Sequence, residues 1–263
     1  MVDLAYVFAG FFVGIVVGLT GVGGGSLMTP ILIFFFGVKP YMAVGTDLLF
    51  AAITKMGGTV SFARQRIVPW RVVGWLSVGS IPAALMTLAT LHWIGPANPQ
   101  VQSVMTHSLG VALLLTAAAM LYKTLRGKQL PPSLGVADQE RATQPRHWSL
   151  PVLFGALIGV LVTLTSVGAG AIGVSVLLLL YPLLPLPRIV AADIAYAVPL
   201  TLVAGLGHAS LGSVDWPLLA KLLAGSLPGI WLGARLMHRT PERLVRAILS
   251  LLLAWAGTKL VLI

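Results

Sequence analysis

The stretch Leu19-Thr20-Gly21-Val22-Gly23-Gly24-Gly25-Ser26 decides how this chain folds. It is a glycine-rich break between two apolar runs, residues 4–18 and 27–37. Both runs are too apolar for a strand or a helix of a soluble protein. A second break of the same shape, Leu164-Thr165-Ser166-Val167-Gly168-Ala169-Gly170, again separates two apolar runs. The chain is therefore organised around two glycine breaks.

The composition indicates an all-α polytopic membrane protein. Of the 263 residues, 57% are hydrophobic and 9% are charged, and the mean hydropathy is +0.96. Several apolar runs approach the roughly 20 residues that a helix needs to cross the bilayer core. The apolar segments are 4–18, 27–37, 41–62, 70–92, 101–122, 150–163, 171–182, 189–211, 216–237 and 244–263.

The charge and the missing motifs exclude several classes of protein. A net charge of +10 is typical of nucleic-acid binding, but here the cations stand in short loops between apolar runs, where membrane orientation explains them. We therefore expect no nucleic-acid partner. The chain has no cysteine and no Walker, HExxH or GxSxG motif, and its intramembrane polar groups are few and scattered. We expect no cofactor, no metal and no catalytic residues. The protein is then not an enzyme.

The two halves of the chain repeat one another. The glycine breaks align at a shift of 145 residues, and the rest of each half aligns at 146. The aligned pairs include Asp47 with Asp193, Trp70 with Trp216, and Gly79-Ser80-Ile81-Pro82 with Gly225-Ser226-Leu227-Pro228. The alternative, chance similarity between two apolar halves, does not explain shared Trp, Pro and Asp positions at one spacing. We expect a first transmembrane repeat over 1–124, a cytoplasmic linker over 125–147 and a second repeat over 148–263.

Loop charges predict that the halves have opposite orientations. Arginines follow segment 41–62, whereas the matching loop 209–216 has none. Loop 92–102 has no cation, whereas its counterpart over 235–246 carries four arginines. Under the positive-inside rule this is an inverted-topology repeat, the plan of many secondary transporters. We expect about eight transmembrane units, in which the glycine-break segments either cross fully or re-enter as hairpins.

The glycine breaks are the candidate binding site. Consecutive glycines make poor helix, and unwound backbone at membrane depth has to lie in protein or line a water-filled cavity. Free amides at the start of the next helix attract an anion, and nearby hydroxyls add donors. The alternative is that small residues only permit close helix packing. The candidate residues are Thr20, Gly21, Gly23, Gly24, Gly25, Ser26, Thr165, Ser166, Gly168 and Gly170.

Four of the ionisable residues inside the apolar segments are candidates for a role in transport. Asp47 and Asp193 are candidate coupling sites for a proton or cation, or simply acids placed at helix N-termini. Lys55 is costly at that depth and is a candidate counter-charge for an anion. It stands about 12 Å along the helix from Asp47, too far for the two to pair. His208 is a third coupling candidate, although a buried, hydrogen-bonded histidine is the commoner case.

Gly18-Leu19-Thr20-Gly21-Val22-Gly23-Gly24-Gly25-Ser26-Leu27-Met28-Thr29-Pro30, followed by Ala43-Val44-Gly45-Thr46, resembles the TauE/SafE (TSUP) family of sulfite and organosulfur exporters. The resemblance covers nearly the whole chain. It implies a multi-pass transporter of the bacterial or archaeal inner membrane, with sulfite, a sulfonate such as sulfoacetate, or a related organic anion as substrate. Asp47 departs from the pattern, because many relatives carry Ser there. The departure points to a coupling role particular to this chain or to a different substrate.

The sequence therefore predicts a secondary transporter for a small sulfur-containing anion. Alternating access would come from the inverted halves rocking about the two breaks, with Lys55 as counter-charge and a proton coupled through Asp47, Asp193 or His208. A transporter or channel for another small organic anion is the alternative. The expected partners are the small anion and membrane lipid. The direction of transport, the coupling ion and the oligomeric state stay open, with a homodimer as one option.

Replacing Gly23 or Gly24 with leucine is expected to abolish flux, because a bulky side chain fills the backbone site without changing membrane insertion. Flux into proteoliposomes and the amount of protein in the membrane are the two measurements. Normal flux in such a variant contradicts the binding role of the first break.

Overall fold

The chain folds into helices joined by short turns. The computed structural model describes residues 2–20, 25–126, 143, 148–236 and 242–262, and this part contains no strand. The helices are α1 (Val2–Thr20), α2 (Gly25–Phe36), α3 (Pro40–Arg64), α4 (Trp70–Ile94), α5 (Pro99–Arg126), α7 (Ser149–Thr165), α8 (Ala171–Leu180), α9 (Leu186–Ser210), α10 (Trp216–Leu236) and α11 (Glu242–Val261). Each lies on one of the apolar segments expected from the sequence, which confirms an all-α fold.

Helix length separates full spans from half spans. Among the described residues, α4, α5, α9 and α10 are long and apolar enough to cross a membrane. The helices that follow the glycine breaks are much shorter, with 12 residues in α2 and 10 in α8. At 1.5 Å per residue they reach about 18 and 15 Å, roughly half of a bilayer core. The two breaks are therefore each followed by a half-length helix.

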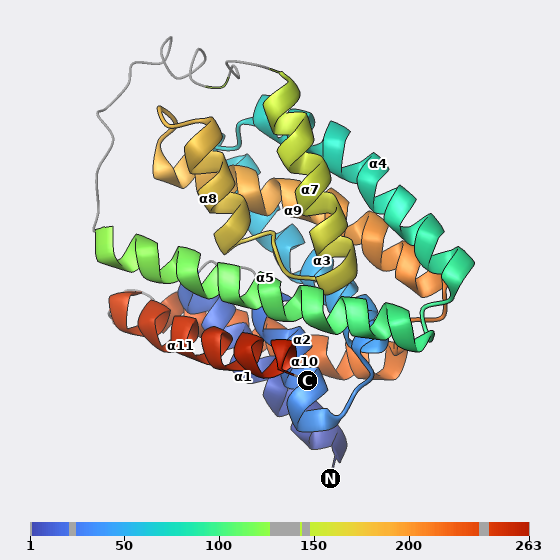
Figure 1. The fold of residues 1–263 in the computed structure, drawn as a ribbon. Coiled ribbons are helices and arrows are strands. Elements are labelled where there is room, and N and C mark those ends of the chain that lie inside the picture. The colour runs from blue at the N-terminus through green and yellow to red at the C-terminus, as the bar shows by residue number, and fades with distance from the viewer. Residues whose placement is uncertain (1, 21–24, 127–142, 144–147, 237–241, 263) are drawn as a thin grey trace.

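The two halves exchange helices with one another. The first helix of each half packs on the fourth helix of the other half, α1 on α10 and α7 on α4. The third helices, α3 and α9, pack together, and so do the last helices, α5 and α11 (Figure 1). Exchanging the two halves leaves this list of helix pairs unchanged. The helix pairing is thus symmetric between the halves, as an internal repeat predicts, while the pseudo-twofold axis and the orientation in a membrane stay predictions.

Glycines set the crossings between the halves. A Cβ atom on Gly14 of α1 would lie 2.4 Å from the carbonyl oxygen of Ser226 in α10. The matching contact in the other half joins Gly159 of α7 to Ser80 of α4, at 2.5 Å. These distances leave no room for a side chain, so the helix backbones touch at the glycines. The repeated contact explains why glycines recur at four-residue intervals in α1 and α10.

The third helices form the centre of the molecule. Residues 43–52 of α3 are all buried, and so are residues 191–197 of α9. A helix buried on every side is expected to be apolar throughout, yet α3 and α9 carry Asp47, Lys55 and Asp193. Polar groups in the most buried elements need partners, and these partners define the site described below. The linker boundaries stay a prediction, because residues 127–142 and 144–147 lie outside the described part.

Gly14→Ala is expected to lower the free energy of unfolding in detergent by about 1–3 kcal/mol, because the added methyl group forces α1 away from α10. Gly74→Ala in α4 is the matched control, since a Cβ there meets nothing within 4 Å. The control is expected to be neutral or stabilising by up to about 1 kcal/mol, through helix propensity alone. If the two variants change thermal unfolding equally, the result contradicts a close contact of α1 with α10 at Gly14.

Candidate functional site

The site is built on the antiparallel packing of α3 and α9. Gly45 faces His208, since a Cβ on the glycine would lie 3.1 Å from the histidine Cβ. At the other end of the pair, the Thr59 hydroxyl lies 3.5 Å from the carbonyl oxygen of Ile194. Low numbers on α3 therefore stand beside high numbers on α9. This register brings ionisable residues from both helices into one row.

The row consists of His208, Asp47, Lys55 and Asp193, in that order, and is called the polar file here. Its members face successive points along α7, the second break and α8. These points are Thr163, Ser166, Ala169 and Gly173 respectively. The broken helix unit of the second half thus runs alongside the whole file.

Asp47 is fully buried and is held by α2. It accepts a hydrogen bond at Oδ2 from the hydroxyl of Thr29. Its other oxygen, Oδ1, has no hydrogen-bond partner. Ser166 of the second break faces this carboxylate without reaching hydrogen-bond geometry, so its buried Oγ is also without a partner. Because Asp47 is the eighth residue of α3, it does not cap its own helix.

Lys55 ties α3 to the second break. Only 5% of its surface is exposed, and Nζ donates a hydrogen bond of 3.1 Å to the carbonyl oxygen of Ala169. The carboxylates of Asp193 and Asp47 both act on it electrostatically. Lys55 therefore lies between the two acids and against unwound backbone, which is where a counter-charge for an anion is needed.

Asp193 lies against the first turn of α8. A Cβ at Gly173 would be 1.9 Å from Asp193 Oδ1, so the missing side chain makes room for the carboxylate. Gly173 is the third residue of α8. Negative charge is favoured there, because the first amides of a helix and its dipole point toward it. Asp193 itself is 2% exposed.

The second break has left-handed backbone at three positions. Ser166 has φ 58°, Gly168 136° and Gly170 139°. The Thr165 hydroxyl donates to the Leu161 carbonyl at 2.6 Å and accepts from the Val167 amide at 3.1 Å, so it braces the loop. Ser166 is the candidate hydroxyl whose side chain is not used in this way.

His208 lies at the far end of the polar file. It is fully buried, and its Nε2 donates to the carbonyl oxygen of Thr163 at 2.9 Å, while Nδ1 has no partner. Fifteen residues separate it from Asp193 on α9, which is about 22 Å. The structure therefore groups Asp47, Lys55 and Asp193 with the second break and leaves His208 closer to Asp47 than to Asp193.

The first break lies largely outside the described residues. This holds for Gly21, Gly23 and Gly24. Thr20 ends α1, while Gly25 and Ser26 begin α2, but the side chains there are also outside the described part. Their role in binding stays a prediction.

Four residues near the file, Thr29, Ser80, Gly173 and Tyr196, were not among the site candidates from the sequence. Thr29 and Gly173 contact the two acids, as described above. Tyr196, three residues after Asp193, is fully buried and lies beside Ser80 of α4, and neither hydroxyl has a partner in hydrogen-bond geometry. Of the four, Tyr196 stands out in the sequence, because it is a large polar residue among the mostly small residues of 191–197. Within the described ranges, no three His, Asp or Glu side chains gather as a metal ion would require.

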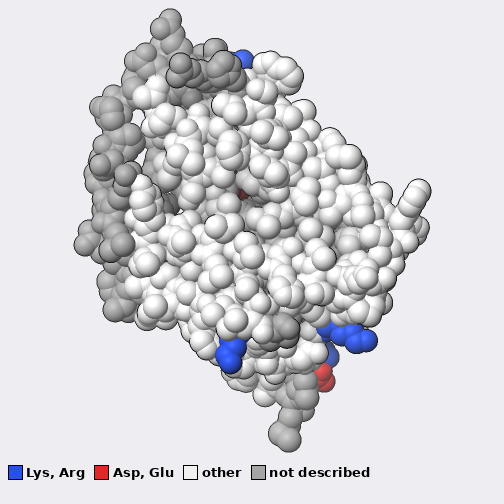
Figure 2. Space-filling view, in the orientation of Figure 1, with Lys and Arg blue, Asp and Glu red and all other residues white. Residues whose placement is uncertain are grey.

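Among the described residues, the face over α7 and α8 is almost free of charge. Figure 2 shows a hollow near the middle of this face, and an atom of an Asp or Glu residue is visible inside the hollow. Ionisable groups elsewhere on this face stand near its edges (Figure 2). The described part of this face is therefore an uncharged surface with one acidic group inside the hollow.

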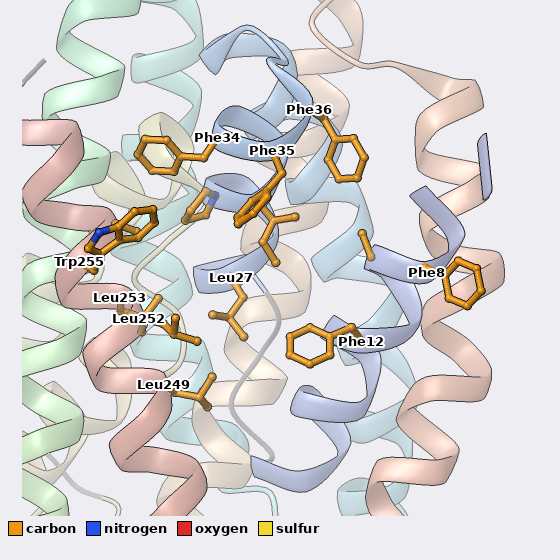
Figure 3. Close-up of a pocket in the computed structure, with 14 residues that line it drawn as sticks. Phe8, Phe12, Leu27, Phe34, Phe35, Phe36, Leu249, Leu252, Leu253 and Trp255 are labelled. Atoms are coloured by element: carbon orange, nitrogen blue, oxygen red, sulfur yellow. The ribbon is translucent and has the colours of Figure 1, made fainter. Parts of the chain in front are cut away.

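A second cavity is apolar. It has a volume of about 510 Å³ and lies between α1, α2 and α11 (Figure 3). Phe34 and Trp255 meet at its rim, with ring centroids 5.8 Å apart. Its other lining residues are Phe8, Ala9, Phe12, Leu27, Pro30, Ile31, Phe35, Phe36, Leu249, Leu252, Leu253 and Ala256. No side chain on this list binds an anion, so the polar file is the candidate site.

Comparison with known proteins agrees with these features. The model of the family described as "Sulfite exporter TauE/SafE" matches residues 6–260. The chain belongs to this family. A probable membrane transporter protein of Bacillus subtilis, YjnA, is 36% identical over 98% of this chain and 100% of its own length. A second, YdhB, is 26% identical over 94% of this chain and 95% of its own length. No solved structure matches the chain.

Membership of the TauE/SafE family settles the class of protein. With its several apolar helices, the chain is a multi-pass membrane transporter rather than an enzyme. The resemblance seen in the first glycine motif is thereby confirmed across nearly the whole chain.

Thr29→Val is expected to lower the free energy of unfolding by about 1–3 kcal/mol, because it leaves a buried carboxylate oxygen of Asp47 without its donor. Thr116→Val is the matched control. Thr116 is also buried, but its hydroxyl bonds to the Ala112 carbonyl of its own helix. Thermal unfolding in detergent measures both, and equal destabilisation would show that the Thr29–Asp47 bond contributes nothing specific.

Proposed function

We propose that this protein is a secondary transporter that moves a small sulfur-containing anion, such as sulfite or an organosulfonate, across the cell inner membrane. The observation that carries the proposal is the position of Lys55, buried against the unwound second break. A charged lysine at that depth is costly, and such residues commonly mark a substrate or ion pathway.

The chemistry around Lys55 favours an anion. The ammonium group offers three donors, of which the Ala169 carbonyl accepts one. The N-terminal turn of α8 and the unpartnered Ser166 hydroxyl add donors and positive potential beside it. An oxyanion such as sulfite or a sulfonate accepts several hydrogen bonds at once. The sulfur assignment comes from the family, whose description names sulfite export.

Alternating access and proton coupling complete the proposal. Two halves related by a pseudo-twofold axis permit an exchange of conformations about a central site. Asp47 and Asp193 flank Lys55 and are the carboxyl groups placed to take up a proton with the anion. The second candidate function is a transporter or channel for another small organic anion, because Lys55 and the helix terminus would hold a carboxylate as well.

The test is uptake into proteoliposomes of labelled sulfite, sulfoacetate, taurine and acetate, with and without a pH gradient. We expect saturable flux of a sulfur oxyanion that responds to the gradient. Flux of acetate alone removes the sulfur assignment. Flux that fails to saturate and ignores the gradient identifies a channel, and flux of none of the four overturns the proposal.

Lys55→Met is expected to abolish saturable flux, with kcat/KM lowered by about a hundredfold or more. The variant loses the charged hydrogen bond between Lys55 and the bound anion, which contributes about 3 kcal/mol. Lys221→Met is the matched control, because Lys221 lies at the surface of α10 and pairs with Asp3. The control should transport normally. Equal flux in both variants contradicts the role of Lys55.

A further inference from the structure

We propose that the substrate anion and the carboxylate of Asp193 compete for one site, formed by the first turn of α8, Lys55 and Ser166, so that the anion binds when Asp193 is protonated. The inference rests on the proposed anion transport and assigns its coupling to one group. In the described structure the carboxylate of Asp193 occupies the position against α8 that the anion would take.

The geometry at α8 supports the shared site. The Asp193 carboxylate lies where a Gly173 side chain would be, at the end of α8 that attracts negative charge. Ala169, which holds the Lys55 ammonium, is four residues before Gly173. The cation and the carboxylate therefore flank the same turn of backbone. A second anionic group cannot fit there while the first is present and charged.

Two polar atoms without partners, one in the break that precedes this turn and one on α3, indicate a ligand. Ser166 Oγ is buried, with 4% of the residue exposed, and has no hydrogen-bond partner. Asp47 Oδ1, which it faces, has none either. Buried polar atoms without partners are rare, and a bound ligand or water is their usual explanation. An oxyanion beside Lys55 would accept the hydrogen bond of Ser166.

The charge balance gives the stoichiometry. With both acids ionised, Asp47, Lys55 and Asp193 sum to one negative charge. Adding a monovalent anion makes two, and a second uncompensated charge in a buried site is strongly disfavoured. One proton on Asp193 restores the original sum and releases Lys55 and the α8 terminus for the anion. A monovalent substrate anion thus enters with one proton.

Few other titratable groups face Asp193. From α3 the file contributes Lys55 and Asp47, and Tyr196 lies on α9 itself. α7 and α8 have no ionisable side chain, and those of α4 are exposed at its ends. The hollow on the face over α7 and α8 contains an acidic atom (Figure 2). Both acids of the file are buried, with 2% of Asp193 exposed and none of Asp47.

The test measures anion binding against pH in Asp193→Asn, which keeps the shape of the side chain and removes the titration. The probes are methanesulfonate and sulfoacetate, whose charges stay constant between about pH 5.5 and 8. In the wild-type protein the Kd by calorimetry is expected to rise by about tenfold per pH unit once the carboxyl is ionised. In Asp193→Asn it should stay constant across the range and match the low-pH wild-type value. Asp47→Asn is the matched variant and should keep the pH dependence for methanesulfonate.

Proton uptake gives a readout that needs no variant. Calorimetry of the wild-type protein in buffers of different ionisation enthalpy counts the protons bound with the anion, and we expect about one for methanesulfonate at neutral pH. No proton uptake overturns the inference, and so does a pH-dependent Kd in Asp193→Asn. Loss of the pH dependence in Asp47→Asn alone also overturns it, because coupling then belongs to Asp47. If neither anion binds the wild-type protein at any pH, the proposed anion transport itself fails.

Discussion

The buried charge of Lys55 is the constraint on which the rest of the site depends. A cation in so apolar an interior is destabilising by several kcal/mol unless hydrogen bonds and opposite charges offset it. The second break supplies the hydrogen bond, because the carbonyl of Ala169 stands outside the helix and accepts from a side chain. The two carboxylates supply the charge. The unwound backbone and the lysine therefore stabilise each other, and neither is easily kept without the other.

The repeated helices position the site, and the residues that differ between the two halves give the site its chemistry. Thr201 takes the place of Lys55 in the second half, and its hydroxyl bonds back to Ala197 of its own helix. Gly173 aligns with Met28, so α8 has room for a carboxylate where α2 has a buried thioether. Two equal halves would give two equal half-sites. Here the first half contributes the cation, Lys55, and the second half contributes the N-terminus of α8 beside it.

Much of the fold follows from the sequence, because apolar length and glycine content act locally. The helices lie on the predicted apolar segments, and the shift of 146 residues anticipates which contacts repeat. The sequence did not reveal that α1 packs on α10. A face of glycines predicts that a helix crosses another closely, but it does not identify the second helix. The order of the polar file was equally hidden. It depends on the antiparallel register of α3 and α9, and Asp47 and Asp193 are too distant in sequence for any local rule to relate them. The bond from Thr29 depends on the same long-range packing.

The exchange of helices between the halves has a consequence for biosynthesis. The partner of α7 is α4, which has already left the ribosome when α7 emerges. The partner of α1 is α10, which is synthesised about two hundred residues later. At ordinary elongation rates the glycine face of α1 waits for about 10–40 s with lipid, or an insertion factor, in place of its partner. The first half of this protein is thus inserted as an incomplete bundle, and its assembly ends only when the second half arrives.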